Sequence, residues 1–287
     1  MRFEELFLFV LLVLATGCAH EQQPGQSSDR SIVPLKDSKD AATNVPVPAK
    51  EELAAITDRG RQLAAYDVAA WHATDAVMKM NPRPEDVQCY IATKETNDWR
   101  VFFGRLSETS NTFLRAFEAI QAKSPREYRV TESRPPVEVT GYLVNAARAI
   151  DICRSDFGSP SRPYNISILP ATNEQMWVYF VPATTEDDVS LLGGDVRYLV
   201  SKDGDHVVEK RKLHLSVLEM KPPKSSREEK VIFGMHTALV DDKPEDTDVF
   251  YVLSRKPSMP EYVMTSNFVY RIETNGGIKC VARHKSK

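Results

Sequence analysis

Apolar and polar positions recur along the chain with two different periods, and each period predicts a different kind of element. Between Glu51 and about Met80, apolar residues recur at steps of three, four and seven, which predicts one long helix stopped by Asn81-Pro82. The apolar face of this helix comprises Leu53, Ile56, Leu63, Ala70, Trp71, Val77 and Met78. Gly60 interrupts its first turns, where glycine costs about 1 kcal/mol relative to alanine. A second helix is predicted from Tyr142 to Arg154.

Runs of β-branched and aromatic residues predict strands elsewhere. Val87–Thr93 and Trp99–Phe103 flank a turn-forming cluster at 95–98, which predicts a hairpin. Periodicity does not decide whether Thr112–Ile120 forms a third strand or a short helix. From about Tyr164 onward strand follows strand, and Met176–Val181 is apolar on both faces. That pattern predicts a central strand covered on both sides.

Two glycine-containing turns fix the expected strand registers. Asp203-Gly204 predicts a two-residue hairpin turn that sets Val200 opposite Val207 and Leu199 opposite Val208.

The second turn, Asn275-Gly276-Gly277, predicts a three-residue loop that pairs Ile272 with Cys280. A two-residue loop would set Ile272 against Lys279, so the longer loop keeps the buried face consistent.

These elements predict an α+β fold. Residues 51–160 would form the N-terminal helix with a small antiparallel sheet, and 161–287 a β-rich, sandwich-like or strongly bent antiparallel sheet. Residues 51–287 are also short enough to form one large domain. The composition is ordinary, with 27% charged residues and a formal net charge of −3, so there is no basic face for nucleic acid and we expect none to bind.

The N-terminus has the pattern of a targeting signal. An apolar run from Leu6 to Leu14 is about half the length of a membrane-spanning helix and leads through Ala15-Thr16-Gly17 to Cys18. This arrangement resembles the lipobox of bacterial lipoprotein precursors. The resemblance implies a signal peptide over 1–17, cleavage before Cys18, and a diacylglycerol and further acyl chain such as palmitate on that cysteine. Ala19 at the next position implies the outer membrane, facing the periplasm.

Residues 18–50 are predicted to be a disordered tether. They are polar, punctuated by proline and almost free of aromatic residues, so they bury too little surface to offset the entropy of ordering. The membrane would be the partner of the protein through the lipid on Cys18, and the tether would keep the domain clear of the membrane surface.

A later segment resembles part of the zinc site of JAMM-type metalloproteases, in which a strand ends in His-x-His and Pro-Ser-x-x-Asp follows. After a predicted strand at Lys230–Phe233, His236 matches the first histidine and Asp248 the carboxylate ligand. Ala238 and Glu245 replace the second histidine and the serine. Catalytic zinc usually has three protein ligands, and this motif supplies two, so we predict no metal and no cofactor. His236 and Asp248 remain candidate catalytic residues, and the alternatives are an inactive relative of that fold or a plain strand-loop-strand.

Other polar groups are assigned to ordinary roles. His206 and His214 lie on predicted strands and are expected to be solvated or hydrogen-bonded. The acidic run at 241–248 has enough oxygens for a calcium ion but lacks the regular spacing of a calcium loop, so we expect a solvated loop. Cys89, Cys153 and Cys280 are expected to be buried free thiols, although one disulfide among them is compatible with an oxidising compartment.

The sequence thus favours a lipid-anchored cell-envelope protein that is a non-enzymatic module for a protein, glycan or small-molecule ligand. The alternative is a periplasmic hydrolase, metal-dependent or an inactive relative of one. An enzyme should bring His236, Asp248 and another carboxylate or histidine together in a pocket, whereas a binding module should expose an apolar patch.

Overall fold

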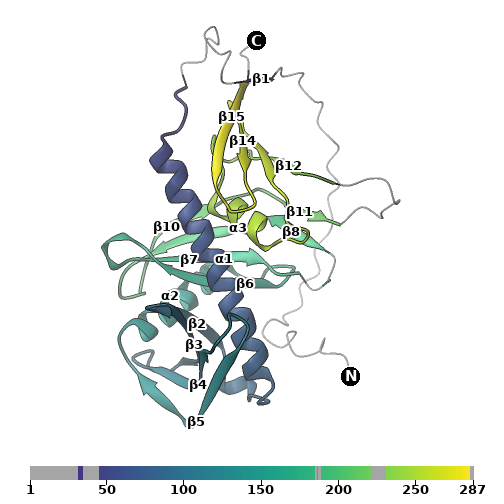
Figure 1. The fold of residues 1–287 in the computed structure, drawn as a ribbon. Coiled ribbons are helices and arrows are strands. Elements are labelled where there is room, and N and C mark those ends of the chain that lie inside the picture. Colours follow the sequence, from purple (N-terminus) through teal and green to yellow (C-terminus); the bar gives the residue numbers. More distant parts are fainter. Residues whose placement is uncertain (1–31, 35–44, 185, 187–188, 222–230, 285–287) are drawn as a thin grey trace.

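The helix α1 (Lys50–Met78) runs along most of the molecule in the computed structural model, which describes residues 32–34, 45–184, 186, 189–221 and 231–284 (Figure 1). It confirms the predicted long helix. Its buried stripe contains most of the expected residues together with Tyr66, Ala69 and Ala73, but Trp71 is 54% exposed, so that assignment is wrong. Gly60 is buried where α1 crosses α3 (Asp246–Ser254); a Cβ there would lie 2.4 Å from the Cβ of Val249.

A four-stranded antiparallel sheet packs against the C-terminal half of α1. Its order is β2 (Cys89–Glu95), β3 (Asp98–Leu106), β4 (Phe113–Gln121) and β5 (Tyr128–Val139). The predicted hairpin is confirmed, and the segment left open between strand and helix is the strand β4.

The second sheet has the order β10-β9-β7-β6 and shares its core with the first. It consists of β6 (Tyr164–Pro170), β7 (Met176–Pro182), β9 (Val196–Val200) and β10 (Val207–Lys212). The helix α2 (Tyr142–Phe157) confirms the second predicted helix, and β7 is an interior strand as predicted. Short 3-10 helices, η3 (Pro84–Asp86) and η4 (Thr172–Glu174), complete this part. One buried cluster extends from Leu63 to Leu213, so it draws on both predicted subdomains.

The third and fourth sheets both contact α3. One pairs β8 (Ser190–Gly193) with β11 (Val217–Met220). The other has the order β1-β15-β14-β13-β12 and joins β1 (Ile32–Pro34), β12 (Gly234–Thr237), β13 (Glu261–Met264), β14 (Phe268–Ile272) and β15 (Ile278–His284). Only the β12–β13 pairing among the described ladders is parallel. The architecture is therefore mixed α+β and mostly sheet, as predicted.

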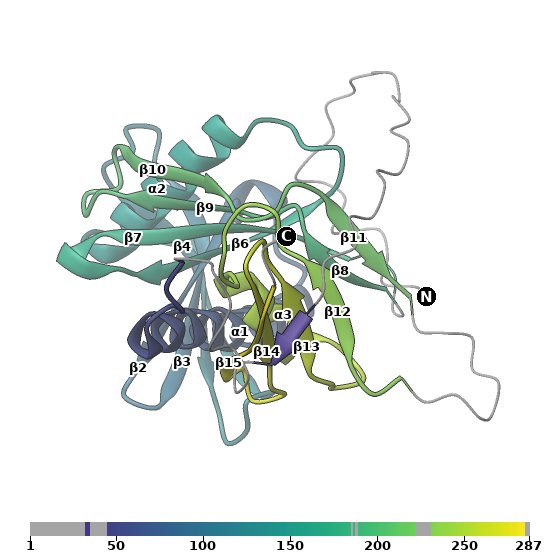
Figure 2. The same ribbon diagram turned by 90° about the horizontal axis from the view of Figure 1, so that it is seen from above.

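A second buried cluster lies between this last sheet and the two helices α1 and α3. It includes Ile56 from α1, Val249 and Val252 from α3, and Val263 and Tyr270 from the sheet. Figure 2 shows α1, α3 and the C-terminal strands gathered on the same side of the longer strands β6, β7 and β9. The N-terminal part of α1 is thus held by residues near the other end of the chain.

Both predicted turn registers need correction. Val200 does face Val207, but a bulge follows and Leu199 faces Glu209 instead of Val208. The connection between the two strands spans residues 201–206, and within it Gly204 lies against α2, where a Cβ would be 2.0 Å from the carbonyl oxygen of Asn145.

The second turn is a three-residue loop, but it begins one residue earlier than predicted. The N–H of Glu273 bonds to the carbonyl oxygen of Gly277, and Ile272 therefore faces Ile278 rather than Cys280. Tyr270 takes Cys280 as its partner.

Two local predictions near the candidate motif are also wrong. Residues 231–233 are not a strand; β12 begins at Gly234, so His236 lies inside the strand. The acidic run at 241–248 is not a solvated loop, because Glu245, Asp246 and Asp248 are buried and α3 starts there. In the described part of the chain no helix is long and apolar enough to cross a membrane.

Candidate metal centre

Three separate segments of the chain bring His214, His236 and Asp248 together. His236 points inward from β12, where Gly234, His236 and Ala238 are buried and Met235 and Thr237 are exposed. Asp248 is the third residue of α3 and forms a capping box with Glu245. His214 comes from the loop between β10 and β11 and not, as predicted, from a strand.

The three side chains present their ligand atoms to one point. Nε2 of His214 and Nε2 of His236 each lie 3.1 Å from Oδ1 of Asp248. Ligand atoms of the three residues all lie within 4.8 Å of one another. Although they are this close, and could form ion pairs if the rings were protonated, neither Nε2 atom nor Oδ1 has a well-formed hydrogen bond to a described residue.

A carboxylate fixes the far side of each imidazole. Asp195 lies 2.7 Å from Nδ1 of His214, and Glu261 lies 3.0 Å from Nδ1 of His236. When Nδ1–H donates to these carboxylates, the neutral ring presents the lone pair of Nε2 to the cluster. Such carboxylate–histidine pairs commonly orient histidines that bind metal ions.

Two glycines leave room for this arrangement. Gly193 has φ +82°, and a Cβ there would lie 2.4 Å from the carbonyl oxygen of Ser216 and 3.0 Å from the Cβ of His214. A Cβ on Gly234 would lie 2.0 Å from Oε2 of Glu261. A side chain at either position would displace one of the histidines or its carboxylate partner.

The cluster carries excess negative charge in a buried place. Its carboxylates are Asp195, Asp248 and Glu261, and its one guanidinium is Arg255, which lies 2.6 Å from Glu261. Three negative charges against one positive charge leave two to be balanced when both imidazoles are neutral. Either one dication or two protons on the histidines would balance them.

The pKa values of the three candidate ligands reflect the same excess of negative charge. Burial alone would lower the pKa of both imidazoles, but Asp248 and Asp195 raise the pKa of His214 to about 11. Asp248 and Glu261 raise the pKa of His236 to about 9. Burial alone would raise the pKa of Asp248, yet the two histidines hold it well below the usual range of a carboxyl group. Without a metal ion, protons therefore occupy the positions that a dication would take.

The donor set suits a transition-metal ion, zinc above all. Two imidazole nitrogens and one carboxylate oxygen match the three protein ligands of many zinc sites. At bond lengths of about 2.0–2.2 Å, ligands of a tetrahedral ion lie roughly 3.3 Å apart, close to the separations at Asp248. Calcium and magnesium prefer all-oxygen shells, so they fit less well.

The structure joins both candidate residues of the motif and adds one that the sequence did not indicate. His236 and Asp248 are adjacent, whereas Ala238, in place of the second histidine, belongs to the second buried cluster. His214 was missed because no local spacing relates it to the motif. Cys18, the predicted lipidation site, lies outside the described residues.

The rest of the acidic run has structural partners. The carboxylate of Asp246 is fully buried and binds Arg59, Arg197 and the hydroxyl of Tyr179, which ties α3 to α1 and to the second sheet. Glu245 bonds Arg211. A cavity of about 280 Å³ lies beside these ion pairs, but each arginine that lines it already has a carboxylate partner.

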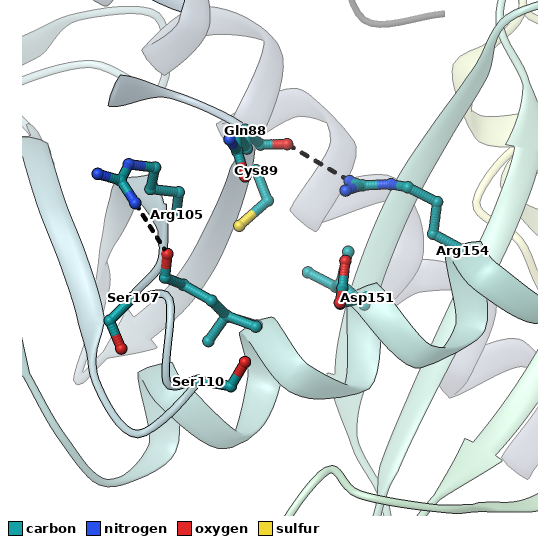
Figure 3. Close-up of a pocket in the computed structure, with 10 residues that line it drawn as sticks. Gln88, Cys89, Arg105, Ser107, Ser110, Asp151 and Arg154 are labelled. Carbon is teal, nitrogen blue, oxygen red and sulfur yellow. Dashed lines mark hydrogen bonds between the residues drawn. The ribbon is translucent and has the colours of Figure 1, made fainter. Parts of the chain in front are cut away.

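A second cavity of about 200 Å³ lies between β3 and α2, with Cys89 on its wall (Figure 3). The guanidinium groups of Arg105 and Arg154 lie on opposite sides of the cavity and donate to the backbone carbonyl oxygens of Leu106 and Gln88. They do not converge on one point, so this cavity offers no comparable binding chemistry.

Comparisons with known proteins add nothing to the geometry: no protein family, no curated protein and no solved structure matches the chain.

Proposed function

We propose that this chain is a lipid-anchored cell-envelope protein whose domain binds one transition-metal dication, zinc being the best fit, at His214, His236 and Asp248. The observation that carries the proposal is the convergence of three buried ligand atoms without hydrogen-bond partners among the described residues. Unsatisfied polar atoms are rare in a protein interior and call for an explanation, and a bound ion is one that accounts for all three atoms at once. The sequence predicted no metal because residues close together in the chain supply only two ligands. In the structure His214 supplies the third ligand, so that reason no longer holds.

The metal would act mainly as a structural centre of a binding module. All three ligand atoms are shielded from solvent, so a large substrate has no path to the ion in this arrangement. An ion there would join β12, α3 and the loop before β11. Apolar side chains close in sequence to the histidine ligands are exposed, with Leu215 69%, Met235 53% and Leu239 73% accessible. If they form one patch, that patch would suit a binding module.

The alternative remains a metal-dependent hydrolase. His214 completes the three-residue set expected of an enzyme, and three protein ligands leave a fourth position for water. This alternative requires the buried centre to open.

Elemental analysis tests the proposal. Full-length protein purified in detergent and dialysed against buffer with trace zinc should carry about one ion per chain, and His214→Ala or His236→Ala should reduce this to near zero. His72→Ala is the matched control, because His72 stacks on Trp71 on α1, belongs to neither group of metal-ligand side chains among the described residues, and its replacement should leave the ion bound. If the protein carried iron instead of zinc, the proposed site would stand and the metal would be iron. Metal-free protein that takes up neither ion on titration would overturn the proposal.

A further inference from the structure

We propose that the ion pair of Arg255 and Glu261 locks the tautomer of His236, making both residues positioning residues for the metal centre. This inference rests on the proposed function, because it concerns how one ligand of that centre is held.

Glu261 is held between two donors. Its Oε1 lies 3.0 Å from Nδ1 of His236, and its Oε2 lies 2.6 Å from Nη1 of Arg255. Arg255 is itself fixed, since its Nη2 donates to the carbonyl oxygens of Met259 and Pro260 at 2.6 and 2.9 Å. Both side chains of the pair are buried. Glu261 therefore has a donor at each oxygen and cannot turn away from either.

A carboxylate satisfies both donors, but an amide cannot. In Glu261→Gln, one end of the side chain would be an NH₂ donor. If the amide oxygen faces Arg255, the NH₂ faces Nδ1 of His236, which must then accept. The ring proton moves to Nε2, and the nitrogen that should bind the metal no longer has a free lone pair. The opposite rotamer sets the NH₂ against a buried guanidinium, which is the costlier contact.

His214 provides the comparison within the same molecule. Asp195 binds Nδ1 of His214 at 2.7 Å, and no arginine or lysine pairs with Asp195 in the part of the chain that the structure describes. In Asp195→Asn the amide oxygen is free to face Nδ1–H, so the correct tautomer survives. The same chemical change should therefore cost far more at Glu261 than at Asp195.

The test is a zinc titration of metal-free, full-length protein in detergent against a chromophoric chelator. Loss of such a partner typically lowers metal affinity about 10–100-fold. We expect Glu261→Gln to lower the zinc affinity about 100-fold, and Asp195→Asn to lower it about 10-fold or less. Adding Arg255→Met to Glu261→Gln should recover roughly 10-fold, because the amide oxygen can then accept from Nδ1–H. The visible spectrum of bound cobalt should show the loss and recovery of a nitrogen ligand.

Denaturation of the metal-free variants separates ligand positioning from general damage. A purely structural role would lower stability without changing the order of affinities or the cobalt spectrum. Equal losses of zinc affinity in Glu261→Gln and Asp195→Asn would overturn the proposed tautomer lock, even if the double variant did not fold. Absence of zinc binding by the unaltered protein would instead overturn the proposed function.

Discussion

Burial acts on single carboxyl groups in opposite directions, depending on what surrounds them. Asp248 is fully buried, and its two histidines nevertheless hold its pKa below the usual range. Asp67 on α1 has no such partners, and burial raises its pKa to about 6. The surroundings of Asp248 therefore stabilise its charge, whereas the charge of Asp67 lowers the stability of the folded state.

Asp67→Asn should therefore stabilise the protein at neutral pH. With a folded pKa of about 6 against an ordinary value near 4, the folded state binds more protons than the unfolded state between these values. Asp67 consequently reduces stability progressively as pH rises from about 4 to 6. Because the side chain is partly exposed, we expect a gain of about 1–2 kcal/mol at pH 8 and none at pH 4.

Urea unfolding at several pH values measures this difference. Asp75→Asn is the matched control, because it makes the same chemical change at an exposed position of the same helix. A gain that was the same at pH 4 and pH 8 would contradict the assignment to ionisation.

At this scale the sequence predicted part of the site. His236 and Asp248 are near each other in the chain, so a motif comparison could find them. His214, Asp195 and Glu261 come together only through strand pairing and helix packing, and no spacing along the chain encodes those contacts.

Among the elements, long periodic segments were predictable and short ones were not. The 29 residues of α1 repeat the apolar pattern often enough to identify it, whereas β12 has four residues. The apolar run before β12 looked like the strand, yet Ile232 is 65% exposed. The helix α3 did carry a local signal, since Glu245 and Asp248 form a capping box that its sequence spacing permits.

The crossing of α1 and α3 gives a prediction at the level of elements. Replacing glycine by alanine inside a helix normally stabilises it by about 1 kcal/mol. At Gly60 the new Cβ would lie 2.4 Å from the Cβ of Val249 and 2.6 Å from the backbone oxygen of Asp246, so α3 would have to move. Gly60→Ala should therefore destabilise the protein by about 1–3 kcal/mol, the usual cost of overpacking.

Thermal unfolding provides the measurement for Gly60→Ala. Ala65→Gly, at an exposed position of the same helix, should lose only about 1 kcal/mol from the change in helix propensity. Stabilisation by Gly60→Ala would show that the two helices are not packed as closely as described. Since Asp246 precedes Asp248 on α3, the variant should also weaken zinc binding.

For the whole molecule, the class of fold was predictable because it follows from the order of helix-like and strand-like segments. The division at residue 160 and the alternative of one domain over 51–287 both stay predictions, and the first two sheets share one buried cluster, which runs from Leu63 to Leu213. The helix α1 also reaches the C-terminal sheet through Leu53 and Ile56. Such contacts depend on how the sheets stack, which local patterns do not specify.

The lipid anchor that we propose from the sequence would hold this molecule at the cell envelope. Acyl chains contribute about 0.8 kcal/mol per buried CH₂, so the two chains of a diacylglycerol on Cys18, joined by a third on its amine, would hold the protein on the membrane permanently. Cys18→Ala should abolish incorporation of labelled palmitate and leave the precursor uncleaved by mass spectrometry. Cys89→Ala, a control at a partly buried cysteine of the domain, should be labelled as the unaltered protein is. Labelling that persists in Cys18→Ala would show that the lipid is not attached at this residue.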